Sequence, residues 1–130
     1  MNEHVRKWII ASGFSFDKIG EDLLVYTSYE DPFLVISKTM FCQKTSDDKY
    51  YISLNKQEIE HAKQRATMHQ ARLLYFISIM HPQFGFLKYL VPEFSLIYFE
   101  AATTSNLEVN LIIDDQFIER LPLGFISLSK

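Results

Sequence analysis

The stretch from Asn55 to Pro82, NKQEIEHAKQRATMHQARLLYFISIMHP, decides which fold the sequence predicts. It contains no glycine and no proline before its last residue, and most of its residues favour helices. Asn55 can cap the first turn, Glu58 can complete a capping box, and Pro82 would end the helix. Apolar residues at helical spacing on one face are Ile59, Ala62, Ala66, Leu73, Ile77 and Met80. We therefore expect one long helix over the whole stretch.

The second half of this stretch is apolar almost all round. Between residues 71 and 80 only Arg72 and Ser78 are clearly polar. One sheet face covers one stripe of a helix, so the other apolar side chains need a second cover. We expect a second copy of the chain to supply it, since symmetric dimers are the commonest assembly. The expected dimer interface consists of Leu74, Tyr75 and Ile79. The terminal helices of the same chain are the alternative cover.

Length and composition favour one globular domain. The 130 residues suffice for a hydrophobic core without disulfides, and Cys42, the only cysteine, fits a reducing compartment. A net charge of −3 gives no basic field to hold nucleic acid, so we do not expect nucleic acid as a partner. The N-terminus lacks an apolar signal segment, and no apolar run is long enough to cross a bilayer. We expect a cytoplasmic protein without membrane contact.

Shorter segments on both sides of the long stretch predict the other elements. Residues 2–12 favour a helix, and residues 23–28, 33–37 and 50–54 favour three strands of an antiparallel meander. After Pro82, residues 84–91 and 95–101 favour a second hairpin. The expected fold class is α+β in a single domain, residues 1–130. In it, the antiparallel sheet of meander and hairpin is packed by a long central helix and two terminal helices.

The segment from residue 107 to residue 121 has two interpretations. Helical spacing of its apolar residues, ended by Pro122, favours a closing helix. The residues with that spacing are Leu107, Leu111, Ile118 and Leu121. Alternation of apolar residues from Leu107 to Ile113 instead predicts a strand, followed by a short helix from Asp114. We expect the helix and keep the strand as the competing interpretation.

This order of elements resembles the secretion-chaperone-like fold, which class I type III secretion chaperones share with the YbjN family of small bacterial proteins. The resemblance covers residues 2–121. The segments that carry it are VRKWIIASGF, DPFLVIS, LLYFISIMHPQFGFLKY, FSLIYFEAATT and IDDQFIERL. It implies a non-catalytic, chaperone-like protein that binds other polypeptides, often as a homodimer.

An aromatic hairpin after the long stretch could supply the surface for such a partner. Core packing is the ordinary role of these side chains, but residues that alternate along a strand cannot all point inward. Some aromatic surface is therefore expected to remain for a polypeptide. The expected partner-binding residues are Phe84, Phe86, Tyr89, Phe94 and Tyr98.

A second resemblance is to the hairpin of a PD-(D/E)XK nuclease core in degenerate form. There a carboxylate on one strand is followed by E-x-K on the next, and here Asp22 is followed by I-S-K at residues 36–38. The chemistry needs two carboxylates on one metal ion and a lysine that activates water. Ile36 cannot bind Mg²⁺, so a carboxylate would have to come from elsewhere, such as Glu58 or Glu60. The residues of this alternative site are Asp22, Lys38 and Glu58.

No other chemical signature is present, and we expect no catalytic site, no metal and no cofactor. Glu58 and His61 have the spacing used in di-iron bundles, but no second copy of the motif exists. The alternative function is a nuclease core, degenerate or with a migrated carboxylate, that acts on or binds nucleic acid. The two interpretations differ at residues 71–80, which form a helix in the chaperone-like fold and a central strand in the nuclease core.

Overall fold

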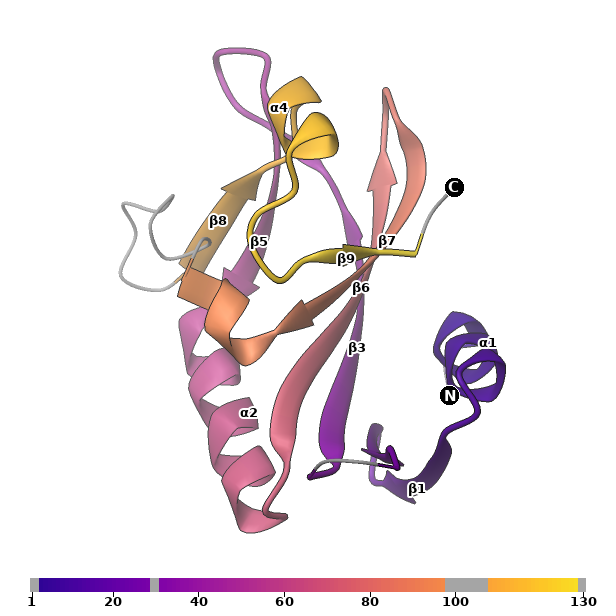
Figure 1. Cartoon of the computed structure of the whole chain (residues 1–130). Coiled ribbons are helices and arrows are strands. Elements are labelled where there is room, and N and C mark those ends of the chain that lie inside the picture. Colours follow the sequence, from indigo (N-terminus) through magenta and orange to yellow (C-terminus); the bar gives the residue numbers. More distant parts are fainter. Residues whose placement is uncertain (1–2, 29–30, 98–107, 129–130) are drawn as a thin grey trace.

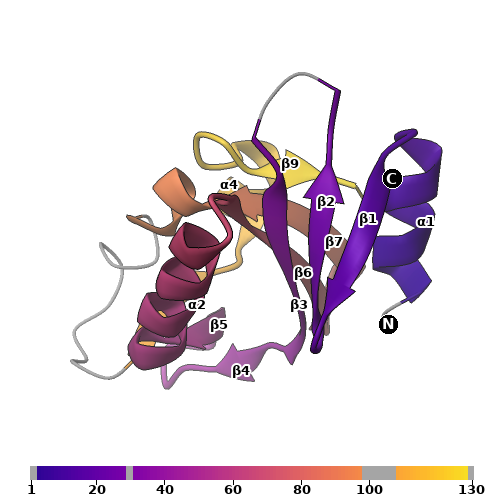
Figure 2. The same ribbon diagram turned by 90° about the horizontal axis from the view of Figure 1, so that it is seen from below.

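A computed structural model describes residues 3–28, 31–97 and 108–128. Within these residues, a six-stranded sheet separates helix α1 (Glu3–Ala11) from helix α2 (Lys56–Met68), as Figures 1 and 2 show. Its strands, in spatial order, are β1 (Ser15–Ile19), β2 (Asp22–Tyr26), β3 (Phe33–Phe41), β6 (Arg72–His81), β7 (Gly85–Pro92) and β9 (Ile126–Ser127). A smaller sheet consists of β4 (Gln43–Lys44), β5 (Tyr50–Asn55) and β8 (Glu108–Ile112).

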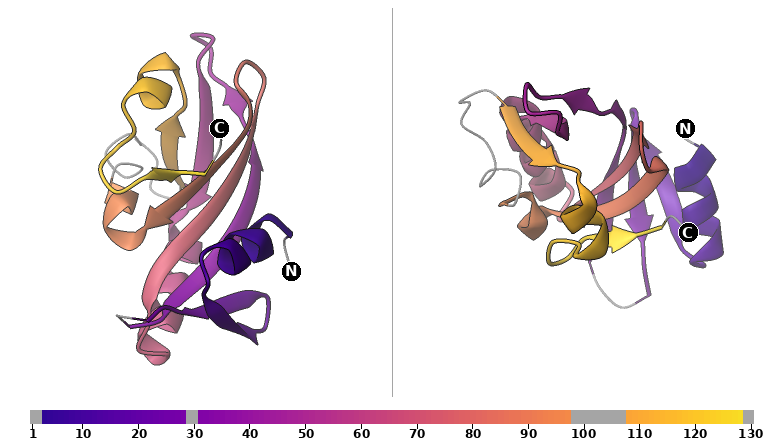
Figure 3. Two further views of the ribbon diagram at one scale, coloured as in Figure 1. Left: turned by 45° about the vertical axis from the view of Figure 1, so that its right-hand side comes forward. Right: turned by 90° about the horizontal axis from the view of Figure 1, so that it is seen from above.

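The pairing of β3 with β6 is parallel, whereas the other strand pairs are antiparallel. Parallel neighbours cannot be joined by a tight turn, because the chain must return to the end at which it started. The return runs through β4, β5 and α2. This crossover places α2 over the face of β3 and β6 that points away from α1 (Figure 3).

The central strand β6 is buried on both faces. Leu73, Tyr75 and Ile77 point to the α2 side, where they share a core with Ile59 of the helix. The alternate residues of β6 point to the α1 side, and Phe76 packs with the core there. A strand covered on both faces carries an almost continuous apolar sequence, because neither set of alternating side chains meets water.

Two short helices also occur in the described part of the chain. The 3₁₀-helix η1 (Glu93–Leu96) follows β7, and α4 (Asp115–Glu119) follows β8. Asp114 caps α4, because its side chain accepts a hydrogen bond of 3.0 Å from the backbone N–H of Phe117. The strand interpretation of residues 107–113 is therefore confirmed over β8, and the expected closing helix is wrong there.

The expected helix from Asn55 to Pro82 is correct in its first half and wrong in its second. Asn55 caps α2, but the helix ends at Met68 and residues 72–81 form β6. The chain turns at Gln70, whose φ of 52° lies in the left-handed region. Glycine is the residue that usually adopts this conformation at a helix end. A glutamine at this position therefore does not predict from the sequence that the helix ends here. The apolar stretch that follows is also what a doubly covered strand requires, and periodicity alone does not distinguish the two.

The α+β class is confirmed, but the sheet differs from the expected one. Residues 22–26 and 33–41 form the expected antiparallel pair, whereas residues 50–55 pair with β8 in the second sheet. The second hairpin is wrong in its return strand, since residues 93–96 form η1, and residues 98–101 lie outside the described part. The secretion-chaperone-like arrangement around a long central helix is thus not present. None of the described helices is long and apolar enough to cross a membrane.

The residues expected at a dimer interface are covered within the single chain. Leu74, Tyr75 and Ile79 are 7%, 1% and 1% exposed. Because residues 72–81 form a strand and not a helix, the elements packed on the two faces of the sheet cover these side chains. The physical reason for a dimer through these side chains is therefore removed.

We predict that Ile79→Ala destabilises the monomer by about 2–5 kcal/mol, because it leaves a cavity in the core on the α2 side. Met80→Ala is the matched control, since Met80 follows on the same strand and is 40% exposed. Its cost is expected to be less than half as large. Urea unfolding followed by circular dichroism measures both values, and equal destabilisation by the two substitutions would contradict the placement of β6.

Candidate functional site

A polar cavity lies between α2 and the sheet. Its volume is about 320 Å³, and polar side chains from four elements dominate its wall. We call it the polar cavity. Its lining residues are Glu21, Asp22, Ile36, Ser37, Lys38, Glu58, His61, Arg65 and Tyr75.

The sheet register brings two predicted site residues to this cavity. Leu23 pairs with Val35, so Asp22, the residue before Leu23, lies beside Ile36. Side chains two positions apart on a strand share a face, so Lys38 follows Ile36 on the α2 side. Asp22 and Lys38 are therefore placed by the same pairing of β2 with β3.

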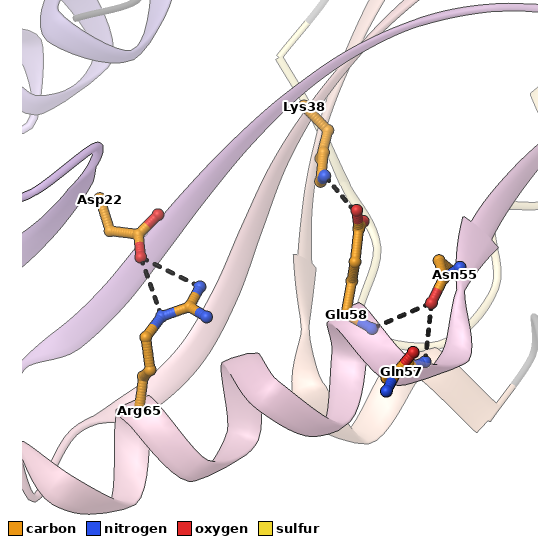
Figure 4. Close-up of polar contacts among 6 residues, drawn as sticks. All are labelled: Asp22, Lys38, Asn55, Gln57, Glu58 and Arg65. Carbon is orange, nitrogen blue, oxygen red and sulfur yellow. Dashed lines mark hydrogen bonds and ion pairs between the residues drawn. The ribbon is translucent and has the colours of Figure 1, made fainter.

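The start of α2 brings the third predicted residue. The backbone N–H groups of Gln57 and Glu58 donate hydrogen bonds of 2.9 and 3.1 Å to the side-chain oxygen of Asn55. This cap fixes where the helix begins. Glu58 and Arg65 are seven residues apart, close to two turns, and therefore lie on the same side of the helix. Figure 4 shows Glu58 pointing to Lys38 and Arg65 pointing to Asp22.

Two ion pairs connect the helix to the sheet across the cavity. Lys38 Nζ lies 3.0 Å from Glu58 Oε2, and Arg65 Nη2 lies 3.1 Å from Asp22 Oδ2. Arg65 Nε also donates to Asp22 Oδ2, at 3.2 Å. The side chains of Glu58 and Arg65 are 60% and 46% exposed, and solvent-exposed pairs contribute only about 0–1 kcal/mol to stability. The pairs are therefore weak enough for an incoming ligand to replace.

Tyr75 lines the cavity from β6. It is 1% exposed and is the parallel neighbour of Ile36 in the register of β3 with β6. Burial raises the pKa of its phenol to about 12, and the charges of Glu58 and Asp22 act in the same direction, whereas Arg65 acts against them. The phenol thus feels charges from both ion pairs. It remains a neutral hydrogen-bond donor through the physiological pH range.

Asp22 and Glu58 are the side chains that could hold a divalent cation. Each carboxylate uses one oxygen in its ion pair, and its second oxygen has no partner among the described residues. Mg²⁺ commonly takes one or two carboxylates and completes its shell with water and substrate phosphates. Asp22 and Glu58 offer this type of ligand in one cavity, and each carboxylate belongs to a separate ion pair. The described residues contain no group of three or more acidic, histidine or cysteine side chains placed to bind a metal.

The predicted aromatic residues do not lie together. Tyr89 is buried and packs edge-on against Phe117, at 5.4 Å between ring centroids. Phe84 lies in the turn before β7 and contacts the ring of His81, whereas Phe86 lies on β7 and contacts the ring of His4. Phe94 lies on η1, beyond the opposite end of β7, and Tyr98 lies outside the described residues. Glu60, the other carboxylate considered, turns away from the cavity and pairs with Lys63 at 3.5 Å.

Arg65 and Tyr75 are cavity residues that the sequence analysis does not assign to the site. Arg65 is not among the predicted site residues, although its spacing of seven residues from Glu58 predicts a shared helix side. Tyr75 was assigned to a dimer interface because residues 71–80 were interpreted as helix. Recognition of β6 as a strand would have placed Tyr75 on the same sheet face as Ile36 and Lys38.

We predict that Tyr75→Phe changes the stability of the protein only at alkaline pH. A phenol with a raised folded-state pKa ionises first in the unfolded chain, so wild-type stability falls as the pH rises between 10 and about 12. Loss of the phenol removes this part of the fall. Urea unfolding at a series of pH values measures it, and identical pH profiles for both proteins would contradict the burial of the Tyr75 hydroxyl.

Comparisons with known proteins bear on the fold. No protein-family model matches the chain, and no curated protein matches it. The chain is similar to a solved structure of Hjc, a Holliday junction resolvase from the archaeal hyperthermophile Archaeoglobus fulgidus. The TM-score is 0.54 at 10% sequence identity, over 85% of this chain and 87% of the resolvase. The likeness fits the PD-(D/E)XK-like fold and not the secretion-chaperone-like family.

This likeness overturns the expected function. The expectation of a non-catalytic, chaperone-like protein with a polypeptide partner depended on a fold that the chain does not have. The similar structure is that of an enzyme named for a nucleic-acid junction, which also contradicts the expectations that the chain is not an enzyme and has no nucleic-acid partner. At 10% identity the likeness itself establishes the fold alone.

Proposed function

We propose that the chain is a divalent-cation-dependent nuclease in which Glu58 replaces the carboxylate that is missing at Ile36. The contact between Lys38 and Glu58 carries the proposal: a glutamate on α2 reaches the lysine of the I-S-K segment at 3.0 Å. Asp22, the other carboxylate of the hairpin, lines the same polar cavity. Two carboxylates and a lysine, from three elements, thus line one cavity, which supports the proposal because the chemistry needs these groups.

Asp22 and Glu58 are the residues that would hold the cation. When bound, the cation would polarise the phosphodiester and make water a better nucleophile at neutral pH. Lys38 would then be released from Glu58 and left free to hold the attacking water or to stabilise negative charge that develops on the phosphate. This exchange costs little free energy, because each exposed ion pair contributes only about 0–1 kcal/mol.

Arg65 and Tyr75 would position the phosphate. Arg65 offers a fork of N–H donors that suits phosphate oxygens, and it is held at the cavity by Asp22. Tyr75, which also lines the cavity, supplies a neutral O–H donor. Neither side chain transfers a proton in this scheme. Their role is to hold the reacting phosphorus in line with the water, which accounts for much of the barrier reduction in such reactions.

We predict Mg²⁺- or Mn²⁺-dependent cleavage of nucleic acid that is lost on addition of a chelator. A four-way DNA junction is the first substrate to test, beside linear duplex and single-stranded DNA and RNA, because the similar structure is named for that junction. Asp22→Asn, Lys38→Met and Glu58→Gln should each reduce the cleavage rate by about 100-fold or more. Rates come from gel analysis of labelled substrates at saturating cation.

Glu60→Gln is the matched control for this experiment. Glu60 lies on the same helix two residues after Glu58, but it pairs with Lys63 outside the polar cavity. Its substitution should leave the cleavage rate unchanged. Absence of cation-dependent cleavage on every substrate would overturn the proposal, as would equal effects of the substitutions at residues 58 and 60.

A second test places a carboxylate at position 36 of β3, where the nuclease hairpin has its glutamate. In the double variant Ile36→Glu/Glu58→Gln, the strand again carries an acid beside Asp22, so part of the lost cleavage should be recovered. Ile36 lines the polar cavity, so the new carboxylate would lie among the polar side chains there. The double variant is compared with Glu58→Gln alone, after circular dichroism has shown that both are folded. A double variant that folds but cleaves no faster would argue against exchange of the two positions.

A further inference from the structure

A second and larger cavity lies at the other side of α2. Its volume is about 870 Å³, and we call it the aromatic cavity. It extends from α1 across the start of β6 and the end of β7 to η1, and it also reaches the second half of α2. Figure 3 shows the start of β6 between α1 and η1. Four aromatic side chains line it: Trp8, Phe14, Phe33 and Phe94.

The aromatic side chains are held in place by the fold. Trp8 packs edge-on against Phe14 at 6.0 Å between ring centroids, and it also contacts Phe76 of the sheet. Phe94 lies so close to Gly124 that a Cβ there would approach its ring to 2.5 Å. Gly124 also has a φ of +87°, a conformation that other residues rarely adopt. The backbone therefore fixes one side of Phe94, while the ring remains 59% exposed beside the cavity.

The chemistry of the wall indicates a ligand with a planar apolar body and negative charge. Leu74 and Leu90 contribute apolar surface, and Lys63 and Arg72 contribute positive charge. Glu93 also lines the cavity, and Lys63 forms an exposed ion pair with Glu60 that a phosphate would have to replace. Aromatic side chains beside cations are the usual means of binding unpaired nucleotides, whose bases stack while their phosphates meet the cations.

We propose that the aromatic cavity binds unpaired nucleotides of a single-stranded segment. The choice of nucleotides over other planar anions rests on the proposed nuclease function. Helix α2 connects the two sites, since Glu58 and Arg65 line the polar cavity whereas Lys63 and Thr67 line the aromatic one. A volume of 870 Å³ lies within the range of about 300–1,000 Å³ that ligand sites occupy. Bases paired in a duplex cannot enter, because their faces are stacked.

Trp8 is the only tryptophan of the chain, so its fluorescence reports on this cavity. We predict that a short oligothymidylate, added to the full-length protein in the presence of EDTA, quenches Trp8 fluorescence saturably and less strongly as salt rises. Phe94→Ala should weaken the affinity by about tenfold, the effect expected for loss of one stacked base. Anisotropy of a labelled oligothymidylate measures the same affinity independently.

Phe41→Ala is the control, because Phe41 is 73% exposed and does not line the aromatic cavity. Its affinity should equal that of the wild type. Phe94→Leu keeps an apolar side chain against Gly124 and should weaken the binding as Phe94→Ala does. Absence of quenching, equal affinity for a blunt duplex, or unchanged affinity in both Phe94 variants would overturn the proposal.

The experiment separates this site from the polar cavity. EDTA removes divalent cations, so quenching does not require cleavage. Asp22→Asn should abolish cleavage and leave the affinity for oligothymidylate unchanged. If no substrate is cleaved but quenching depends on Phe94, the nuclease proposal fails and the nucleotide site stands. If cleavage occurs without quenching, the nuclease proposal stands and the nucleotide site fails.

Discussion

The parallel pairing of β3 with β6 is the constraint on which the rest of the structure depends. It forces the chain to return through a long crossover, and α2 is the part of that crossover that covers the sheet. Because α2 lies over the face that carries Lys38, Glu58 can reach that lysine from the helix. Both the core on the α2 side and the polar cavity therefore follow from the direction of one strand pair.

The same pairing explains how a nuclease-like site can tolerate an apolar residue at position 36. Ile36 faces α2 between Asp22 and Tyr75, where it is 7% exposed and belongs to the hydrophobic core. A carboxylate supplied by the helix leaves that position free for packing. In the proposed arrangement, the strand gives one acid and the lysine, and the first turn of α2 gives the second acid. The cap at Asn55 also contributes to the site, because it fixes where α2 begins and thereby the position of Glu58 along the sheet.

Much of the local structure could be predicted from the sequence, but the topology could not. The helix start at Asn55 and the strand pair of residues 22–26 and 33–41 follow from capping and alternation. The helix end could not be recognised, because Gln70 adopts the left-handed conformation that glycine normally signals. The following apolar residues suit a doubly buried strand as well as a buried helix. Because of this ambiguity, the sequence analysis predicts a helix where the central strand lies. For the same reason it predicts Tyr75 at a dimer interface and not in the site.

Whether a divalent cation binds between Asp22 and Glu58 is the central question, and paramagnetic NMR answers it most directly. Substoichiometric Mn²⁺ broadens the amide signals of residues that lie near the bound ion. Our account predicts the strongest broadening at Asp22, Lys38 and Glu58, and its loss in Glu58→Gln. Broadening elsewhere, or broadening at Asp22 that persists unchanged in Glu58→Gln, would contradict the claim that the helix supplies the missing carboxylate.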